Sequence, residues 1–440
     1  MTWSFGIQRE ITKDMAIEVR YAAQRSLQEW YLAGLNEANI VENGWIEEFR
    51  KAQANLYANM AANKGRTFRY DSTVPGTQPL PTILAYLSPN KLDPNVSSNY
   101  TSSVLGSTQA GVFTNTSYVN YLNNYNPNPG SLASAMYGDA TRRGWAIGNG
   151  LPANFFVMNP DVSNAYVYKN GGGSMYDSMV VELRRRMSKG LLVQASYTWA
   201  KGFDVGFLSW RSPWVKDLGG TLPHALKLNW VYDLPIGQGR ALFGGVGGWT
   251  DRIIGGWEFE GTSRIQSGNL RDLGNINLVG MTVKEFQDSL EFDFDDANKK
   301  IWIIPEDIRT QSYYAYQYDA GGFTSGAPSG RYVAPAGSAN GGNCIQIVSG
   351  DCAPRHHYFR ALPFARFDLS LVKRIRFTET KNFELRGEFL NAFNNINFNS
   401  ISSTSGSSLN MGLVNGAFTD NSNSQDPGGR LVQIVLRLNF

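Results

Sequence analysis

The sequence has few of the residues on which soluble enzymes and metal proteins depend. It contains no G-x-x-x-x-G-K-[ST] phosphate loop, no H-E-x-x-H zinc motif and no G-x-S-x-G nucleophile elbow, which are local patterns of three large enzyme classes. Its 440 residues include only three histidines, His224, His356 and His357. No acid–base or nucleophile constellation can be assembled from these residues, so we expect a protein that is not an enzyme and uses no cofactor.

Long apolar runs and strong charge are missing as well. No eighteen consecutive apolar residues occur, which excludes a transmembrane helix but not transmembrane strands, whose signal is alternation over about ten residues. The formal net charge is +3, and no basic block indicates a nucleic-acid partner. The start, MTWSFGIQREITKDM, lacks the basic and apolar regions of a signal peptide. If the protein lies outside the cytoplasm, we therefore expect this chain to be a fragment or to be exported as part of something longer.

The two cysteines, Cys344 and Cys352, lie in a stretch rich in Gly, Ser and Asn. Two unrelated thiols are one alternative, but we expect a short-loop disulfide and, with it, an oxidising compartment. A structural zinc site requires four ligands, and the nearby His356 and His357 fit no standard spacing. We therefore expect no metal there and interpret both histidines as loop or rim residues. His224 is expected to be a satisfied residue on a strand face.

Pairs of alternating segments joined by short turns are the strongest pattern in the sequence. Within each segment, apolar residues recur at every second position, as a strand with one apolar face requires. The expected strands are residues 3–10 with 15–23, 175–187 with 191–199, 225–234 with 257–266, 366–377 with 382–393, and a final strand at 430–440. These are nine strands, and residues 64–174 have room for one or two more.

Long polar segments rich in Asn, Ser, Gly and Pro separate the pairs. They cover residues of about 24–174, 201–221, 266–362 and 394–429, lengths that argue against a compact soluble domain. Short turns on one side and long loops on the other are typical of an outer-membrane barrel. Helical spacing at residues 43–63 and from Thr282 onward predicts two ordered loop elements, which we interpret as parts of loops and not as a second domain.

Aromatic residues gather on the expected apolar faces. They are Trp3, Tyr197, Trp199, Trp230, Tyr232, Trp257 and Phe440. Tyr and Trp favour the membrane interface, where an apolar ring and a polar tip are both satisfied. A large soluble β-sandwich or propeller would also alternate, but a propeller should repeat about every forty residues, and no such period is found. We therefore predict an all-β, antiparallel transmembrane β-barrel whose long extracellular loops carry short helices.

Charged residues of the polar faces leave alternatives open. The acidic residues Glu291, Asp293, Asp295 and Asp296 could bind calcium, but they lack the EF-hand order and its glycine, so an ordinary acidic loop is favoured. Several arginines are expected on the lumen side, where they would form ion-pair ladders in the barrel wall or meet an anionic substrate or the carboxylates of a plug. They are Arg184, Arg186, Arg366, Arg374, Arg376 and Arg386.

The end of the chain resembles that of outer-membrane barrels. Val432, Ile434, Leu436, Leu438 and Phe440 alternate up to an aromatic last residue, which in that family is a signal for the barrel-assembly machinery. The E-x-x-N-x-F-N core made by Glu388, Asn391, Phe393 and Asn394 resembles the penultimate strand of TonB-dependent transporters. Residues 3–21, 182–204, 229–239, 253–268 and 344–375 resemble the Oar-like subgroup of these receptors.

This resemblance implies the C-terminal part of a TonB-dependent receptor. Such receptors have about 22 strands around a plugged lumen, and here no plug, TonB-contacting box or signal peptide is visible. The implied function is import of a bulky nutrient (siderophore, glycan or peptide), with TonB as a partner through a plug outside this chain and outer-membrane lipid around the barrel. The alternative is a structural or adhesive outer-membrane protein that uses its loops as a contact surface.

Overall fold

The predicted antiparallel sheet is present, and it contains the nine predicted strands. The computed structural model describes residues 1–337, 350–352, 356–378, 381–419 and 428–440. In these residues one large sheet has the order β1-β2-β3-β4-β6-β7-β15-β16-β19, with the short β5 beside β4. The strands are β1 (Thr2–Thr12), β2 (Met15–Gly34), β3 (Tyr166–Ser188), β4 (Leu191–Gly206), β5 (Val215–Leu218), β6 (His224–Asp233), β7 (Trp257–Gln266), β15 (Phe364–Arg376), β16 (Asn382–Leu390) and β19 (Leu431–Asn439).

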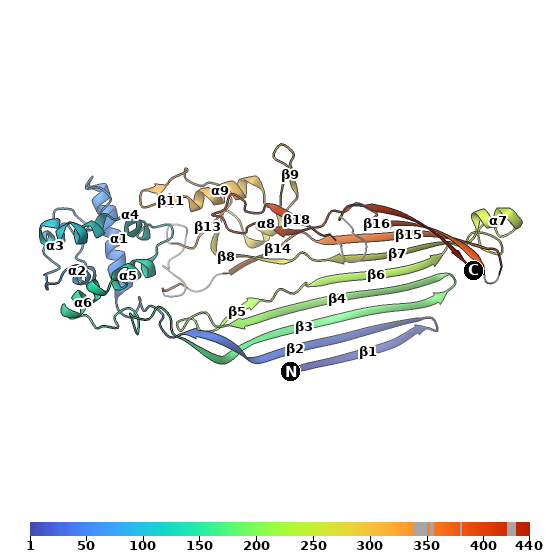
Figure 1. The fold of residues 1–440 in the computed structure, drawn as a ribbon, viewed down its shortest axis with the longest axis horizontal. Helices are drawn as coiled ribbons and strands as arrows, with labels where there is room; N and C mark the ends of the chain where they lie inside the picture. Colours follow the sequence, from blue (N-terminus) through green and yellow to red (C-terminus); the bar gives the residue numbers. More distant parts are fainter. Residues whose placement is uncertain (338–349, 353–355, 379–380, 420–427) are drawn as a thin grey trace.

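The two ends of the sheet differ as predicted. At one end, short turns join β1 to β2, β3 to β4 and β15 to β16 (Figure 1). The β3–β4 turn uses Lys189 (φ 51°) and Gly190 (φ 77°), two successive positive φ angles that match the right-handed twist of a hairpin. The connector at residues 234–256 is longer than these turns and contains the helix α7 (Gly248–Ile254). Because barrels place their short turns in the periplasm, we call this the periplasmic end.

The long loops, as far as the structure describes them, lie at the opposite, outer end (Figure 1). They occupy residues 35–165, 207–223, 267–363 and 391–430, so the predicted boundaries of the first loop are wrong by about ten residues on each side. The error arises because β2 and β3, with 20 and 23 residues, continue well beyond the roughly ten residues that cross a membrane. Alternation weakens in those extensions, and they project the first loop away from the sheet.

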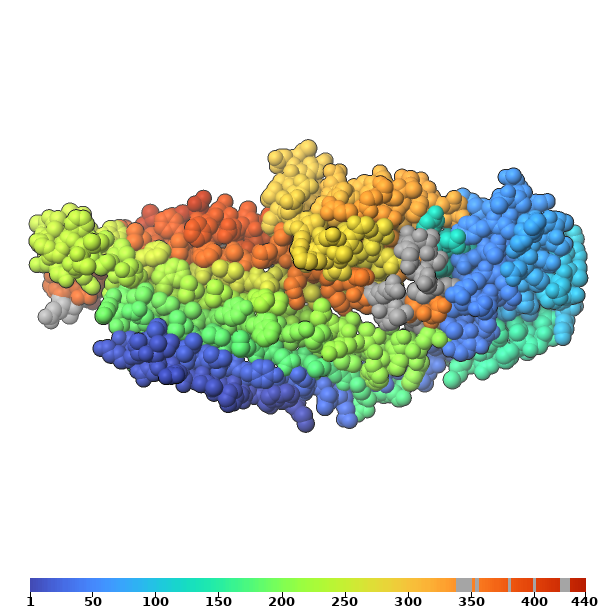
Figure 2. Space-filling model, turned by 180° about the vertical axis from the view of Figure 1, so that it is seen from behind, coloured from blue at the N-terminus to red at the C-terminus, as the bar shows by residue number. Residues whose placement is uncertain are grey.

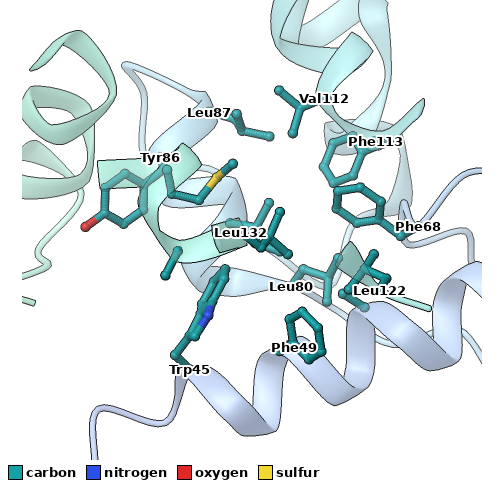
Figure 3. Packing of buried hydrophobic residues seen from close by; sticks show 14 of the residues in the cluster. Trp45, Phe49, Phe68, Leu80, Tyr86, Leu87, Val112, Phe113, Leu122 and Leu132 are labelled. Carbon is teal, nitrogen blue, oxygen red and sulfur yellow. The ribbon is translucent and has the colours of Figure 1, made fainter. Parts of the chain in front are cut away.

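The first loop is a helical insertion with a hydrophobic core of its own. Its helices are α1 (Trp45–Ala61), α2 (Pro81–Leu87), α3 (Ser102–Ala110), α4 (Thr116–Tyr121), α5 (Pro129–Tyr137) and α6 (Ala140–Gly148), with the 3₁₀ turns η1 (Ser97–Tyr100) and η2 (Gly111–Thr114). Trp45, Phe49, Leu80 and Leu132 meet at its centre (Figure 3). The predicted helix at 43–63 is confirmed as α1. The prediction of additional strands in 64–174 is wrong before Tyr166, because helices occupy that region.

No helix among the described residues is long and apolar enough to cross a membrane. The α-helices of the insertion are six to 17 residues long. All of them except α3 bury apolar residues in a shared core. Because helices do not produce the two-residue alternation of strands, this packing explains why no strand could be assigned within residues 64–174.

A second core holds the later loops together. It lies between β8 (Leu270–Val279), α8 (Val283–Asp288), α9 (Glu306–Tyr316), β13 (Tyr332–Pro335) and β14 (His356–Arg360), and it includes Met411 from the last loop. The short strands β9 (Asp293–Asp295), β10 (Lys300–Trp302), β17 (Phe398–Ile401) and β18 (Val414–Ala417) belong to the same loops. The hairpin of β11 (Tyr318–Asp319) and β12 (Gly322–Phe323) instead places Ala320 in the core of the insertion. The helix predicted from Thr282 is confirmed: Thr282 and Glu285 form a capping box at the start of α8.

The outer loops also contact one another. Arg66 of the insertion pairs with Asp319 (2.7 Å), Arg50 pairs with Asp351 (3.1 Å), and the rings of Tyr125 and Phe323 lie 4.2 Å apart. These contacts join the loops into one folded layer. The molecule is elongated, with this loop layer at its outer end and α7 at its periplasmic end (Figure 2).

Candidate functional site

Strand register divides the large sheet into one apolar and one polar face. Residues paired across neighbouring strands share a face. One row across the sheet is Leu191, Tyr232, Phe259, Leu371, Gly387 and Ile434. A row on the other face, three residues closer to the outer end, is Arg184, Gln194, Asn229, Thr262 and Asp368. The predicted aromatic residues all fall on the first face, as expected for a surface that meets lipid.

The apolar face carries a set of polar contacts near its outer limit. Arg25 forms a bidentate ion pair with Asp177 (2.9 and 3.0 Å), which also accepts a hydrogen bond from the Tyr21 hydroxyl (2.6 Å). Tyr197 and His224 share a hydrogen bond of 2.7 Å, so His224 is a satisfied strand residue, as predicted. Charge paired in this way and surrounded by Tyr and Trp marks the level where lipid tails give way to headgroups.

An ion-pair ladder crosses the polar face near the periplasmic end. Arg374 pairs with Glu258 and with Glu384 (2.9 Å). Arg386 pairs with Glu384 (3.4 Å) and with Glu260 (2.8 Å). These contacts join β7, β15 and β16, so the prediction of ladders is confirmed for Arg374 and Arg386. Arg184 likewise pairs with its neighbour Glu182 (2.8 Å).

A row of three cations lies closer to the outer end of the polar face. Lys227, Arg264 and Arg366 are direct partners on β6, β7 and β15. Like charges placed opposite one another on adjacent strands destabilise a sheet. Asp368 pairs with Arg366 (3.0 Å), and the guanidinium groups of Arg264 and Arg366 stack on the rings of Phe364 and Phe418 (5.2 and 5.8 Å). The row thus places three positive charges side by side on the polar face.

This cationic row lines a cavity of about 480 Å³. Ser196, Asn229 and Thr262 add neutral hydrogen-bonding groups to its floor, and Phe418 reaches over it from the last loop. A hollow of about 280 Å³ on the outer side shares Arg264, Phe364 and Phe418 with it. Another of about 300 Å³ on the ladder side shares Asn229, Thr262 and Asp368. The three hollows form one polar track, which we call the lumen track, running from the outer loops along the sheet.

The Asn-rich motif after β16 forms a buried junction at the outer end of the sheet. Asn391 is 1% exposed and has a φ of 47°. Its side-chain amide donates to the carbonyls of Asn395 and Gly428 (both 2.9 Å), and its oxygen accepts from the Asn395 N–H (3.0 Å). The Asn391 N–H itself donates to Asp368 (2.7 Å). The motif therefore connects β15, the last loop and the start of β19 beside the lumen track.

In the helical insertion, a buried carboxylate holds the start of α2. Glu48 of α1 accepts hydrogen bonds from the N–H groups of Thr82 (2.9 Å) and Ile83 (2.7 Å), a capping role that a local side chain usually fills. Burial raises the pKa of Glu48, against the opposing effect of these bonds. Burial also raises the pKa of Tyr86 to about 12. These groups serve the insertion's own fold.

The remaining predicted site residues are dispersed. Cys344 lies outside the described residues, so its disulfide with the buried Cys352 stays a prediction. His356 pairs with Asp272 (2.8 Å) at the rim. Asp295 accepts two hydrogen bonds from Asn298 in the β9–β10 hairpin, and the described residues contain no group of three or more His, Cys, Asp and Glu placed to hold a metal ion. Val432, Ile434, Leu436 and Leu438 share the apolar side of β19, Phe440 follows the strand, and each of the five is more than half exposed.

These features define a class of protein: an antiparallel membrane-spanning sheet with a lipid face, a polar face and a folded outer loop layer. Residues 51–433 match the model of a family described as outer membrane beta barrel domain. The chain belongs to this family, and the protein is located in the outer membrane.

Among solved structures, the chain is similar to the crystal structure of the outer membrane transporter YddB from Escherichia coli, at 9% identity and a TM-score of 0.32. That match covers 100% of this chain and 32% of the transporter chain, so this chain spans about a third of that protein's length. No curated protein matches the sequence significantly.

Proposed function

We propose that this chain forms part of the barrel of a TonB-dependent receptor that imports a bulky nutrient carrying an anionic group. The cationic row of Lys227, Arg264 and Arg366 in the lumen track is the observation that carries this proposal. A barrel wall that is purely structural gains nothing from three like charges in register. An anionic group of a passing nutrient, or a carboxylate of a plug, offsets that repulsion through charge-assisted hydrogen bonds.

The outer loops supply the first contact in this proposal. The insertion and the second core are folded units, and ion pairs between them hold the loop layer in one arrangement. Binding then loses little conformational entropy in the loops, which favours affinity for a large ligand. In this proposal the energised step requires TonB, a partner protein, and a plug domain of the receptor that is not among the residues of this chain.

The alternative is an adhesive or structural outer-membrane protein. The observation in its favour is the helical insertion, which spans residues 35–165 and is carried beyond the membrane on the extended β2–β3 hairpin. A rigid projecting unit of this kind is a suitable contact surface. An adhesive protein would not use the lumen track, whereas a transporter would, and this difference separates the two functions.

Uptake measured in cells tests the proposal. The bacterium that carries the gene is compared with an in-frame deletion and with a deletion complemented by Lys227→Gln/Arg264→Gln. The probes are a ferric siderophore, an acidic oligosaccharide and an acidic peptide, each radiolabelled, with and without an uncoupler. We expect the deletion to lose uncoupler-sensitive uptake of one probe and the double variant to retain only a small part of it. Arg184→Gln, on the same face but outside the cavity, is the control and should transport normally.

Two results would contradict the proposal. Uptake of all three probes could be unchanged in the deletion while attachment of cells to a surface falls, which would favour adhesion. Alternatively, the double variant could transport as well as the control, which would leave the cationic row without a role in transport.

A further inference from the structure

The connector between β6 and β7 contains a helix that exposes two large apolar residues and turns a carboxylate inward. In α7, Trp249 and Ile253 are one turn apart and are 75% and 69% exposed. Asp251, on the opposite side of the helix, turns inward and accepts a hydrogen bond from the Gln238 N–H (2.5 Å). A surface helix normally directs its apolar residues toward the protein and its carboxylates toward solvent. Here the two are exchanged.

Helix α7 is attached to the lipid side of the sheet. The Trp257 indole N–H donates to the Ile253 carbonyl at the end of the helix (3.3 Å). The Lys373 ammonium bonds to the Gly255 carbonyl and lies 5.4 Å from the centre of the Trp257 ring. Trp257 and Lys373 are register partners in the same row as Leu385 and Leu436, on the apolar face. The helix therefore joins the periplasmic limit of the surface that meets lipid.

The exposed apolar surface is larger than the helix alone. Leu242 and Phe243, earlier in the connector, are 52% and 66% exposed. Together with Trp249 and Ile253 they are the exposed large apolar residues of the connector, and we call these four residues the connector patch. The Arg252 guanidinium lies 4.8 Å from the centre of the Trp249 ring, which places a cation beside the apolar residues. In Figure 2 the connector forms a knob at the end of the molecule opposite the helical insertion.

We propose that the connector patch is a membrane anchor that inserts into the phospholipid headgroup region of the periplasmic leaflet. Its occupant is lipid because the patch continues the apolar face of the barrel, and because a Trp with an adjacent Arg matches the chemistry of the interface, where rings contact acyl chains and cations contact phosphates. Four large apolar side chains are less favourable in contact with water than in contact with lipid. The anchor fixes the height of β6, β7 and β15, and with them the cavity, relative to the bilayer.

Depth-dependent quenching tests this proposal. Ile253→Cys is labelled with the fluorophore NBD, and the protein is folded into phosphatidylcholine vesicles that contain lipids with a nitroxide either at the headgroup or high on the acyl chain. The control is Lys13→Cys, an exposed position in the β1–β2 turn at the same end of the sheet. The parent protein, taken through the same labelling, corrects for its own cysteines. Heat-modifiable gel mobility confirms that each variant is folded.

We expect the nitroxides to quench the label at position 253 at least about twofold more than the label at position 13, as for a group seated in the interface. Aqueous iodide should show the opposite order. Equal quenching of the two labels by lipid nitroxides would overturn the proposal. A label at 253 that neither lipid nitroxides nor iodide reach would also overturn it, and would show instead that protein covers the patch.

Discussion

The hydrogen bonds of the buried Asn391 side chain can be removed by two substitutions, Asn391→Gly and Asn391→Ala, which differ only in the β-carbon. Its side chain makes three hydrogen bonds, to Asn395 and Gly428, and is 1% exposed. At about 1 kcal/mol for each bond, Asn391→Gly should lower the free energy of unfolding by about 3 kcal/mol. Asn391→Ala loses the same bonds and must in addition place a β-carbon at a φ of 47°, which costs about 1 kcal/mol more.

The assay is urea-induced unfolding of the vesicle-folded protein, followed by tryptophan fluorescence under conditions where refolding retraces unfolding. The expected order of stability is wild type, then Asn391→Gly, then Asn391→Ala. Asn410→Ala, at an exposed loop asparagine, is the control and should stay within about 0.5 kcal/mol of wild type. If Ala were tolerated as well as Gly, the positive φ would carry no cost. If both variants matched wild type, the junction would not contribute to stability.

Three further predictions concern other parts of the chain. Gly261→Ala should destabilise the protein by about 1–3 kcal/mol in the same assay, because a β-carbon there would lie 2.2 Å from the Trp230 ring; an unchanged unfolding curve would refute this packing. Deletion of Phe440, which is 93% exposed, should leave stability in vesicles unchanged but remove most of the protein from the outer membrane in cells, and normal levels on immunoblots would contradict its role as an assembly signal. The raised pKa of Glu48 means that the folded state holds this proton more tightly than the unfolded state, so the insertion should lose stability as pH rises from about the ordinary value of 4.5 through that raised value. Amide exchange in α1 and α2, corrected for intrinsic rates, should show this decline, and Glu48→Gln should abolish it; an equal decline in both proteins would assign it to another group.

The strands could be predicted because their signal is local. Alternation in the segments around Val19, Val181 and Leu228 depends only on the pleat of each strand, and the short turns confine each pair to one register. The structure confirms all nine strands and the face of every predicted aromatic residue. The capping box at Thr282 and Glu285 was predictable for the same reason, since both partners lie within one helical turn.

The lumen track could be predicted only in part. The sequence placed Arg366, Arg374 and Arg386 on a polar face, but it did not single out Lys227 or Arg264. Their alignment with Arg366 depends on the pairing of β6 with β7 and of β7 with β15. A 97-residue loop separates β7 from β15 in the sequence. A signal existed, because the polar alternating positions of 225–234 and 257–266 include Lys227 and Arg264, but its meaning required the register.

The sequence by itself determined the antiparallel class of the sheet, the identity of its lipid face and the end at which the long loops lie. These follow from period two and turn length, which the chain expresses within a few residues. Only the tertiary structure decided that residues 35–165 fold around their own core, that Glu48 caps a distant helix, that three cations share one row, and that α7 turns its apolar side outward. Each of these depends on segments distant in sequence packing together, and no local period encodes which segments will meet.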